Sequence, residues 1–218
     1  MHSNMAYAAD VSIPLQGSLF DTGGEIALGP LDGLRRTDLG LGAWVDVLPG
    51  WLSGADELFD RLVTRAAWRA DRRTMYDRVV DVPRLVASYG EREQLPDPIL
   101  ADARAALSDR YATELGEPFS TAGLCWYRDG NDSVAWHGDT FGRGATIDTM
   151  VAILSVGAAR PLLLRPRGGG ASLRYHLGHG DLLVMGGSCQ RTWEHAVPKT
   201  RRPIGPRISI QFRPRGVF

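Results

Sequence analysis

Lysine is almost missing from this chain of 218 residues. Lys199 is the only lysine among 25 basic residues, so arginine carries nearly all the positive charge. From Val156 onward there are 11 basic residues against two acidic ones, Asp181 and Glu194, although the whole chain has a net charge of zero. Because the guanidinium group is planar and permanently charged, this half favours carboxylate or phosphate ligands. A merely solvated arginine-rich surface is the alternative, since a basic half alone does not establish nucleic-acid binding.

Cysteine is also scarce, and long apolar runs are absent. Cys125 and Cys189 are the only cysteines, which excludes a disulfide framework and predicts two free, buried thiols. No run reaches the length of a membrane-spanning helix, and the first residues lack the basic-then-apolar pattern of a secretion signal. We therefore expect a cytoplasmic protein with no membrane partner. The length and the apolar content of 44% fit one sizeable domain.

The first 40 residues are rich in Gly, Ala and Asp and show no sustained periodicity. They predict a partly ordered N-terminal extension, residues 1–45, followed by a domain at residues 46–218. Within the extension, "QGSLF" (Gln16–Phe20) resembles the short peptide motif by which bacterial proteins bind the sliding clamp. An apolar segment that packs against its own domain is the alternative interpretation.

Two helices are predicted before residue 115. Residues 53–69 carry an apolar stripe at helical spacing, and Ser53 with Asp56 matches a capping start. The stripe consists of Leu58, Phe59, Leu62, Val63, Ala66 and Ala67. Residues 98–111 form the second predicted helix, in which Pro98 suits the first position. Its inward side consists of Ile99, Leu100, Ala103, Ala106 and Leu107.

Beyond Ser120 the pattern changes to short β-prone runs separated by Gly, Pro, Asp or Asn. These runs are "AGLCWYR", "SVAWHGD", "TMVAILSV", "PLLLRP", "SLRYHL", "DLLVMGG", "TWEHAV" and "RISIQFRPR". About eight closely spaced strands favour a sandwich or jelly roll over a parallel sheet linked by helices. Helices followed by a β-rich second half make the expected fold class α+β.

Histidine is the third scarce residue type, with five in the chain. In "SVAWHGDTF", His137 and Asp139 are two residues apart, so on a strand both side chains reach one ion. His195 follows several predicted strands later, which is far enough for the chain to return beside them. Two histidines and one carboxylate form the facial triad of non-haem iron(II) oxygenases, which leaves coordination positions open.

Other residues compete for the third ligand position. His176 and His179 are rivals, but "YHLGHGD" predicts a polar turn and therefore surface histidines. Glu194 precedes His195 and would point to the opposite face of its strand. A pair of His and Asp alone is weak support for a metal site, because chance produces it often.

The last predicted strand, "RISIQFR", places two arginines on one face. Its apolar residues Ile208, Ile210 and Phe212 alternate with a polar row of Arg207, Ser209, Gln211 and Arg213. Burying two arginines is costly unless anions pair with them. Arg207 and Arg213 suit the opposite ends of a small dicarboxylate, as an iron enzyme that uses 2-oxoglutarate requires. A solvent-facing row on an edge strand is the alternative.

Together, "YRDGNDSVAWHGD", "WEHAVPK" and "RISIQFR" resemble the AlkB family of iron(II)- and 2-oxoglutarate-dependent nucleic-acid dealkylases. The similarity extends from about Val82, in "DVPRLVASYGE", to Arg213, about 60% of the chain. The order of tyrosine, HxD, histidine and two arginines spaced by five residues is specific in combination. The resemblance implies a double-stranded β-helix, or jelly roll, at about residues 120–214, with N-terminal helices and a substrate lid at about residues 46–115.

The resemblance also implies roles for individual residues. His137, Asp139 and His195 would bind Fe(II), and Tyr127 would contact the cosubstrate 2-oxoglutarate. Arg207 and Arg213 would bind 2-oxoglutarate as well, with Arg207 at the remote carboxylate, and Ser209 stands where members often have asparagine. With O2, the iron site would hydroxylate a methyl group on a damaged base, and formaldehyde would leave. The flipped base would stack on Trp68, Tyr89 or the face of His137.

Two positions depart from the family pattern. Cys125 occupies the place, two residues before the tyrosine, where many members use asparagine toward the cosubstrate. Phe141 stands two residues after the aspartate, where many repair members carry an acidic residue that contacts the base. Because phenylalanine can only pack or stack, the base preference does not transfer.

Three functions remain open from the sequence. The leading hypothesis is oxidative dealkylation of DNA or RNA bases, with arginines that hold phosphates. The second is a 2-oxoglutarate-dependent hydroxylase or demethylase of a protein side chain, a lipid or a nucleoside. The third is a non-enzymatic jelly-roll binding module that is recruited through Gln16–Phe20.

Overall fold

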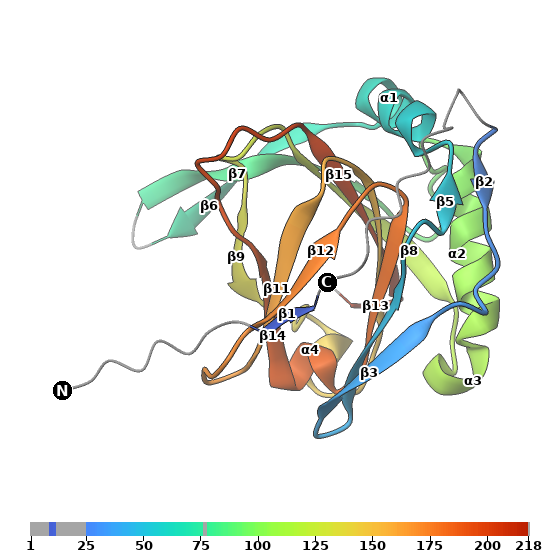
Figure 1. Cartoon of the computed structure of the whole chain (residues 1–218), viewed down its shortest axis with the longest axis vertical. Helices are drawn as coiled ribbons and strands as arrows, with labels where there is room; N and C mark the ends of the chain where they lie inside the picture. Colours follow the sequence, from blue (N-terminus) through green and yellow to red (C-terminus); the bar gives the residue numbers. More distant parts are fainter. Residues whose placement is uncertain (1–8, 12–24, 76–77, 218) are drawn as a thin grey trace.

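The computed structural model describes residues 9–11, 25–75 and 78–217 (Figure 1). The predicted clamp-binding motif Gln16–Phe20 lies outside the described residues and stays a prediction. Within the part of the chain that is described, no helix is both long and apolar enough to cross a lipid bilayer. Both cysteines are free, as predicted; Cys189 is buried, whereas Cys125 is partly exposed.

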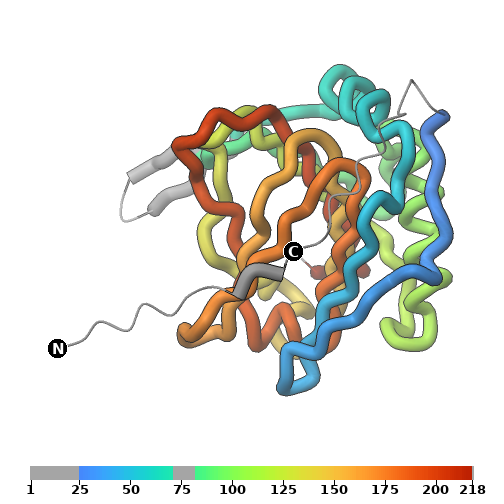
Figure 2. The backbone as a smooth tube through the Cα atoms, viewed as in Figure 1, coloured from blue at the N-terminus to red at the C-terminus, as the bar shows by residue number. Residues whose placement is uncertain are grey.

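Eight strands form a large antiparallel sheet. Their order is β3 (Arg35–Gly40), β4 (Ala43–Leu48), β13 (Asp181–Gly187), β10 (Val151–Gly157), β15 (Arg207–Pro214), β8 (Phe119–Tyr127), β7 (Arg78–Tyr89) and β6 (Arg69–Met75). Neighbours in the sheet are often distant in the sequence. Figure 2 shows the blue chain of β4 beside the orange-red chain of β13, with which it pairs.

A second sheet of five strands faces the first. Its order is β1 (Ala9–Val11), β12 (Leu173–Leu177), β11 (Arg160–Pro166), β14 (Trp193–Val197) and β9 (Val134–His137). Its pairs are antiparallel except for β1 with β12. The remaining elements are a ribbon of β2 (Ala27–Leu28) with β5 (Leu52–Ser53), a 3-10 turn η1 (Arg143–Ala145) and the short helix α4 (Cys189–Thr192). All eight runs predicted beyond Ser120 are strands, β8 to β15.

Side chains that alternate along the large sheet build two separate cores. On β15, Ile208, Ile210 and Phe212 pack toward the helices, in a cluster that also contains residues of β10 and β13. The other face of the large sheet packs against the small sheet; for example, Ile153 of β10 and Leu164 of β11 share a second cluster. Two facing sheets with helices on one outer side confirm the predicted jelly roll.

The helices lie against the outer face of the large sheet (Figure 1): α1 (Ala55–Arg65), α2 (Pro98–Arg110) and α3 (Ala112–Leu115). Helix α2 confirms the prediction, and Asp97 caps it by accepting a hydrogen bond from the backbone N–H of Ile99. The predicted capping of the first helix by Ser53 and Asp56 is wrong. Its N-cap is Gly54, whose φ of 64° lies in the left-handed region, and no side chain caps it.

The predicted first helix also ends earlier, at Arg65. Ala66 takes an extended backbone, and the indole N–H of Trp68 donates to the backbone oxygen of Leu62. The chain then enters β6 and β7, two strands that the sequence pattern did not predict. The boundary drawn at residue 45 falls inside β4, because β3 and β4 belong to the large sheet.

A buried carboxylate ties the β3–β4 hairpin to the helices. Asp46 is 2% exposed and accepts hydrogen bonds from Arg36 Nε at 2.8 Å, Arg36 Nη2 at 2.7 Å and the hydroxyl of Tyr111 at 2.8 Å. The Arg36 guanidinium also lies 3.6 Å above the ring of Trp44. Since Arg36 is partly exposed, water screens its half of this pair.

We expect Asp46→Asn to lower the free energy of unfolding by about 2 kcal/mol, because an amide cannot accept three charge-assisted donors. Tyr111→Phe removes one donor and leaves the carboxylate with Arg36, so it should cost about 1 kcal/mol. Urea unfolding followed by tryptophan fluorescence measures both. An Asp46→Asn variant as stable as the wild type would show that the network contributes nothing net.

Candidate metal centre

The two histidines of the predicted triad lie opposite each other on paired strands. His137 ends β9, and His195 lies in β14 directly across from it, with ring centroids 4.2 Å apart. Asp139 follows β9 by two residues. One ligand atom from each of the three lies within 4.8 Å of the others, and among the described residues they form the only such group. The structure therefore brings together the three residues predicted to bind metal.

The sequence predicted that His137 and Asp139 share a strand. In the structure, Asp139 lies two residues beyond the end of β9. Its backbone N–H donates to Gln190 Oε1 at 2.9 Å, which fixes the segment after β9. Gly138 makes this close approach feasible, because a Cβ there would lie 2.5 Å from the backbone oxygen of Gln190. The geometry thus depends on α4 as well as on β9.

Hydrogen bonds orient the ligand atoms. His137 Nδ1 donates to the backbone oxygen of Ala135 at 2.9 Å, which leaves Nε2 for the centre, 3.8 Å from Asp139 Oδ1. The other carboxylate oxygen, Oδ2, accepts from Arg213 Nε at 2.7 Å. Arg213 therefore occupies one oxygen of Asp139 and leaves the other to a cation.

The electrostatics keep the three ligands unprotonated at neutral pH. Burial lowers the pKa of His195 to about 3, and burial also lowers the pKa of His137. Burial alone would raise the pKa of Asp139, but the charge and hydrogen bond of Arg213, together with the adjacent histidines, outweigh it and lower that pKa to about 2. Two neutral imidazoles and a carboxylate suit a divalent transition metal such as Fe(II).

The rival ligands point elsewhere. His179 lies in the turn after β12, as predicted, and its Nδ1 accepts a hydrogen bond from the backbone N–H of Gly157 at 2.7 Å. His176 lies within β12 rather than in a turn. Glu194 accepts from Arg165 Nη2 at 3.0 Å, and neither it nor the two histidines belongs to the metal-binding group.

A cavity of about 80 Å³ extends from His137 and His195 between the two sheets. The polar row predicted on the last strand faces it, in the order Arg207, Ser209, Gln211 and Arg213. Strand β15 lies between β10 and β8, so the alternative of an exposed edge strand is wrong. The cavity has room for a small organic acid beside the metal ligands.

Arg207 is the strongest indication of an anion in this cavity. It is 1% exposed, and its Nε donates to Ser155 Oγ at 2.8 Å. Its Nη1 is buried and finds no hydrogen-bond partner among the described residues. Burial lowers the pKa of Arg207, because a cation held away from water without a counter-ion is unfavourable. A carboxylate on Nη1 would satisfy both the donor and the charge.

Other predicted cosubstrate residues surround Arg207. The ring of buried Tyr127 lies 5.6 Å from the Arg207 guanidinium and 5.7 Å from that of Arg160. Ser209 Oγ accepts from Gln211 Nε2 at 2.6 Å. Arg213 lies in the cavity with its Nε bonded to Asp139, and Arg207 Nη1 is the buried donor of the polar row that has no partner among the described residues.

The structure does not bring all predicted substrate residues to the cavity. Trp68 packs against Trp126 with ring centroids 5.4 Å apart, on the helix-covered face of the large sheet. Tyr89 packs against the same cluster and accepts from the backbone N–H of Ala67. Because β8 and β15 lie between this cluster and the metal ligands, the stacking role predicted for Trp68 and Tyr89 is not supported. Phe141 is 72% exposed in the segment after Asp139.

Several residues of the site were not singled out from the sequence as functional. Arg84 on β7 lines the cavity, and its Nη1 donates to the backbone oxygen of Ser133 at 3.2 Å. Ser155 and Gln190 hold Arg207 and Asp139, and Gln211 was recognised only as a member of the polar row. The only signal in the sequence was that each is a single polar or charged residue in a largely apolar segment, which does not reveal its partner.

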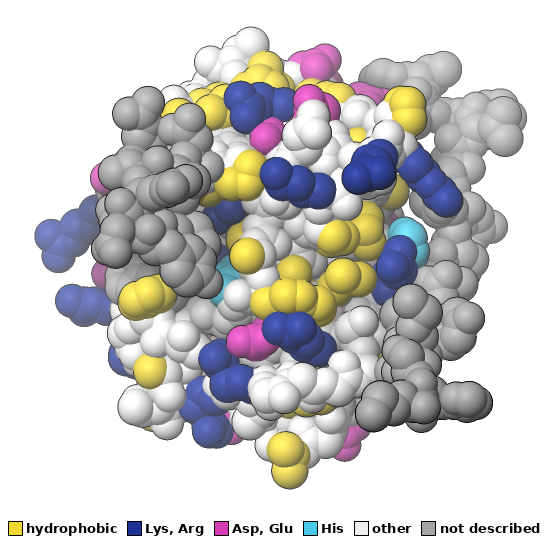
Figure 3. Space-filling model, turned by 90° about the vertical axis from the view of Figure 1, so that its left-hand side faces the viewer, with side chains coloured by type: hydrophobic (Ala, Val, Ile, Leu, Met, Phe, Trp, Pro, Cys, Tyr) yellow, Lys and Arg dark blue, Asp and Glu magenta, His cyan; other side chains and the backbone are white. Residues whose placement is uncertain are grey.

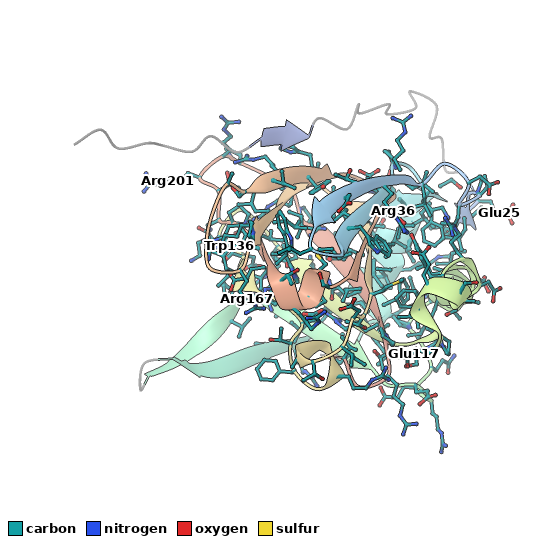
Figure 4. All side chains as sticks on the ribbon, turned by 90° about the horizontal axis from the view of Figure 1, so that it is seen from below. Glu25, Arg36, Glu117, Trp136, Arg167 and Arg201 are labelled. Atoms are coloured by element: carbon teal, nitrogen blue, oxygen red, sulfur yellow. The ribbon has the colours of Figure 1, made fainter. Side chains whose placement is uncertain are left out.

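Arg165 on β11 and Arg167, just beyond its end, support the metal-binding group from outside. Arg165 donates from Nε and Nη2 to Glu194 Oε2, and its guanidinium lies 4.2 Å from the ring centre of Trp136. Arg167 donates from Nη2 to the backbone oxygen of Gln190 at 3.3 Å. Trp136 adjoins His137, Glu194 adjoins His195, and Gln190 binds Asp139. Figure 4 shows Trp136 and Arg167 on the same flank of the molecule.

We expect Glu194→Gln to weaken metal binding about three- to tenfold, because the neutral side chain releases Arg165 and loosens the strand that carries His195. Titration with Co(II) under calorimetry measures the affinity. Glu57→Gln is the matched control, since it breaks an ion pair with Arg61 on α1, away from the metal-binding group. Equal affinities in both variants would show that the ion pair between Glu194 and Arg165 does not position the ligands.

Comparisons with known proteins agree with this geometry. The 2OG-Fe(II) oxygenase superfamily model matches residues 45–213. Alpha-ketoglutarate-dependent dioxygenase alkB homolog 3 of Homo sapiens is 32% identical over 208 residues, covering 87% of this chain and 69% of that protein. DNA oxidative demethylase ALKBH2 of Bos taurus is 27% identical over 179 residues, covering 73% and 64%. The chain thus spans about two thirds of the length of these relatives.

Solved structures share the fold at lower identity. A 2OG-Fe(II) oxygenase family protein from Burkholderia pseudomallei has a TM-score of 0.55 and 17% identity, covering 79% of this chain and 86% of that one. OsALKBH1 has a TM-score of 0.56 and 15% identity, covering 83% and 100%. With the His137–Asp139–His195 centre and the buried arginine beside it, these matches show that the chain belongs to the AlkB family of iron(II)- and 2-oxoglutarate-dependent dioxygenases.

Proposed function

We propose that this protein removes alkyl groups oxidatively from the bases of DNA or RNA. The observation that carries the proposal is the similarity to relatives that are named DNA oxidative demethylases, together with a family model whose match, residues 45–213, includes the metal-binding group. The distribution of charge supports it as well. Lys and Arg side chains are spread over the face seen in Figure 3, with acidic groups among them, and these basic side chains would contact phosphates.

Each residue of the site would have a distinct role in the reaction. His137, Asp139 and His195 would hold iron, and Arg213 would keep one oxygen of Asp139 engaged. Arg207 would hold the remote carboxylate of 2-oxoglutarate beside Tyr127. When bound, iron and 2-oxoglutarate together supply the reduction of O2 and the hydroxylation of a substrate C–H bond. A hydroxylated N-methyl group then leaves the base as formaldehyde.

Phe141 would shape the choice of base. It lies exposed two residues after the ligand aspartate, where it can stack on or pack against a base but cannot accept a hydrogen bond from an exocyclic amino group. A base that has no exocyclic amino group to be bound by such an acceptor is therefore the better substrate. Phe141→Asp should shift the preference toward bases that carry an exocyclic amino group.

Formaldehyde release tests the proposal. Protein purified without oxygen is supplied with iron(II), 2-oxoglutarate and O2, together with DNA and RNA oligonucleotides that carry 1-methyladenine or 3-methylcytosine. We expect release that depends on 2-oxoglutarate and disappears in His137→Ala. Weaker binding of the best oligonucleotide at higher salt would confirm that arginines hold its phosphates.

Two other outcomes would assign different functions. If succinate forms but no oligonucleotide yields formaldehyde, the protein is a hydroxylase of a protein side chain, a lipid or a nucleoside. If bound iron supports neither product, the jelly roll is a binding module. Recruitment to a sliding clamp is a separate prediction, and unchanged clamp binding after Leu19→Ala and Phe20→Ala would remove it.

A further inference from the structure

A thiol lies in the cavity that the metal ligands and Arg207 share. Cys125 is partly exposed and lines this cavity, with its Sγ 3.8 Å from Gln211 Oε1. The thiol has no role in holding metal, because the ligand group consists of His137, Asp139 and His195. It is thus a nucleophile that the proposed reaction does not use.

The position of the thiol relative to the arginines is defined by strand register. Cys125 pairs with Ser209, and Tyr127 pairs with Arg207, on the neighbouring strand β15. Along β15, Ser209 lies between Arg207 and Arg213 and faces the same cavity. A dicarboxylate with one end on Arg207 would therefore pass the thiol with its middle carbons.

Arg207 gives the cavity its preference for anions. Its buried Nη1 has no partner among the described residues, and its nearest aromatic neighbour, Tyr127, is uncharged at neutral pH. Arg84 and Arg213 line the same cavity, whereas the carboxylate of Asp139 is already bonded to Arg213. The cavity is therefore a cationic site that holds a nucleophile.

We propose that Cys125 is a covalent modification site for small unsaturated dicarboxylates, of which fumarate is the simplest. The proposal rests on carboxylate binding by Arg207. The Cys125 sulfur forms a bond to one alkene carbon, the C=C π bond breaks, and the thiol proton ends on the other alkene carbon. No group leaves, and no external oxidant or reductant is required. The product is a thioether that carries two carboxylates.

The adduct would inactivate the enzyme by occupying the cosubstrate site. Its carboxylates lie within reach of Arg207, so 2-oxoglutarate and the adduct exclude each other. Modification then depends on the ratio of unsaturated dicarboxylate to 2-oxoglutarate rather than on either concentration alone.

The second cysteine provides an internal control. Cys189 is 2% exposed in the core between the two sheets and is not part of the cavity lining. Burial raises the pKa of its thiol to about 12, so almost none is thiolate at neutral pH. A reagent that reaches Cys125 through the cavity should therefore leave Cys189 unchanged.

Mass spectrometry of the full chain tests the proposal. Iron-loaded protein is incubated with fumarate without oxygen, and the adduct is located by peptide mapping. We expect one adduct, on Cys125, formed at least about tenfold faster than with the thiol of glutathione, because Arg207 raises the local concentration of the reagent. Adding 2-oxoglutarate at ten times its dissociation constant should slow the reaction about tenfold.

Two variants distinguish a reaction that Arg207 directs to Cys125 from an undirected reaction of an accessible thiol. Cys125→Ser should show no adduct. Arg207→Met should react with fumarate no faster than glutathione does, yet still react with neutral iodoacetamide at Cys125. Should Arg207→Met not fold, protection of the wild type by 2-oxoglutarate provides the same comparison.

The proposal is overturned if the adduct forms on Cys189, if none forms, or if 2-oxoglutarate does not protect. These outcomes are distinct from failure of the proposed function. If no oligonucleotide yields formaldehyde while Cys125 is modified and protected, the substrate class is wrong and the modification site stands. An unmodified Cys125 in a protein that does release formaldehyde would overturn the modification site alone.

Discussion

We expect His195→Ala to weaken metal binding at least about 100-fold and to abolish 2-oxoglutarate turnover. Only His137 and Asp139 then remain, and Asp139 offers one oxygen because Arg213 holds the other. Since changes at residues that merely support a ligand cost about 10- to 100-fold in metal affinity, loss of a ligand should cost at least about 100-fold. Calorimetric titration with Co(II) measures the affinity, and succinate formation measures turnover.

His179→Ala is the matched control for this prediction. It also removes a histidine, but one that accepts a hydrogen bond from the backbone of Gly157 and does not belong to the metal-binding group. We expect its metal affinity to equal that of the wild type. If His195→Ala still bound Co(II) as tightly as His179→Ala, the assignment of the centre would be wrong.

Arg207→Met has the second large effect, a rise of about 10- to 100-fold in the KM for 2-oxoglutarate. The magnitude follows from losing charge-assisted hydrogen bonds worth about 1.5–3 kcal/mol in a site that excludes water. Arg207→Lys should recover only part of it, because an ammonium group cannot form the planar two-donor contact. Metal affinity should not change, since Arg207 does not contact the ligands.

The stability of the metal-free protein distinguishes this role from a structural one. In the absence of an anion, Arg207 is a buried cation with an unused donor, and replacing such a group by an apolar side chain is often neutral or stabilising. We therefore expect the Tm of metal-free Arg207→Met to equal or exceed that of the wild type. A lower Tm with an unchanged KM would show that Arg207 serves the fold alone.

The periodicity of apolar residues predicted the strands in the second half of the chain but missed several strands in the first half. Strands β8 to β15 are apolar and bounded by turn residues, so each could be recognised. Strands β3 and β6 read "RRTDLG" and "RADRRTM", whose charges conceal any alternation. They form because an adjacent strand offers a ladder of hydrogen bonds, which is a tertiary effect.

The grouping of His137, Asp139 and His195 was predictable because the spacing of the first two is itself the signal. His137 and Asp139 are close in the sequence, and β9 and β14 only had to pair. The roles of Gln190 and Ser155 were not predictable, because each acts on a residue more than 50 positions away. The stacking expected of Trp68 and Tyr89 is unsupported for a related reason, since an aromatic residue does not reveal which side of a sheet it faces.

Strand β15 lies in the middle of the large sheet but comes last among the strands in the sequence, so it limits when that sheet can form during synthesis. It pairs with β10 and β8, and β4 pairs with β13, so the large sheet has a high contact order and should fold slowly. Until residue 214 has left the ribosome, β8 and β10 present open edges, which invite aggregation. The same late strand brings Arg207 and Arg213, so a nascent chain cannot complete the active site before it completes the sheet.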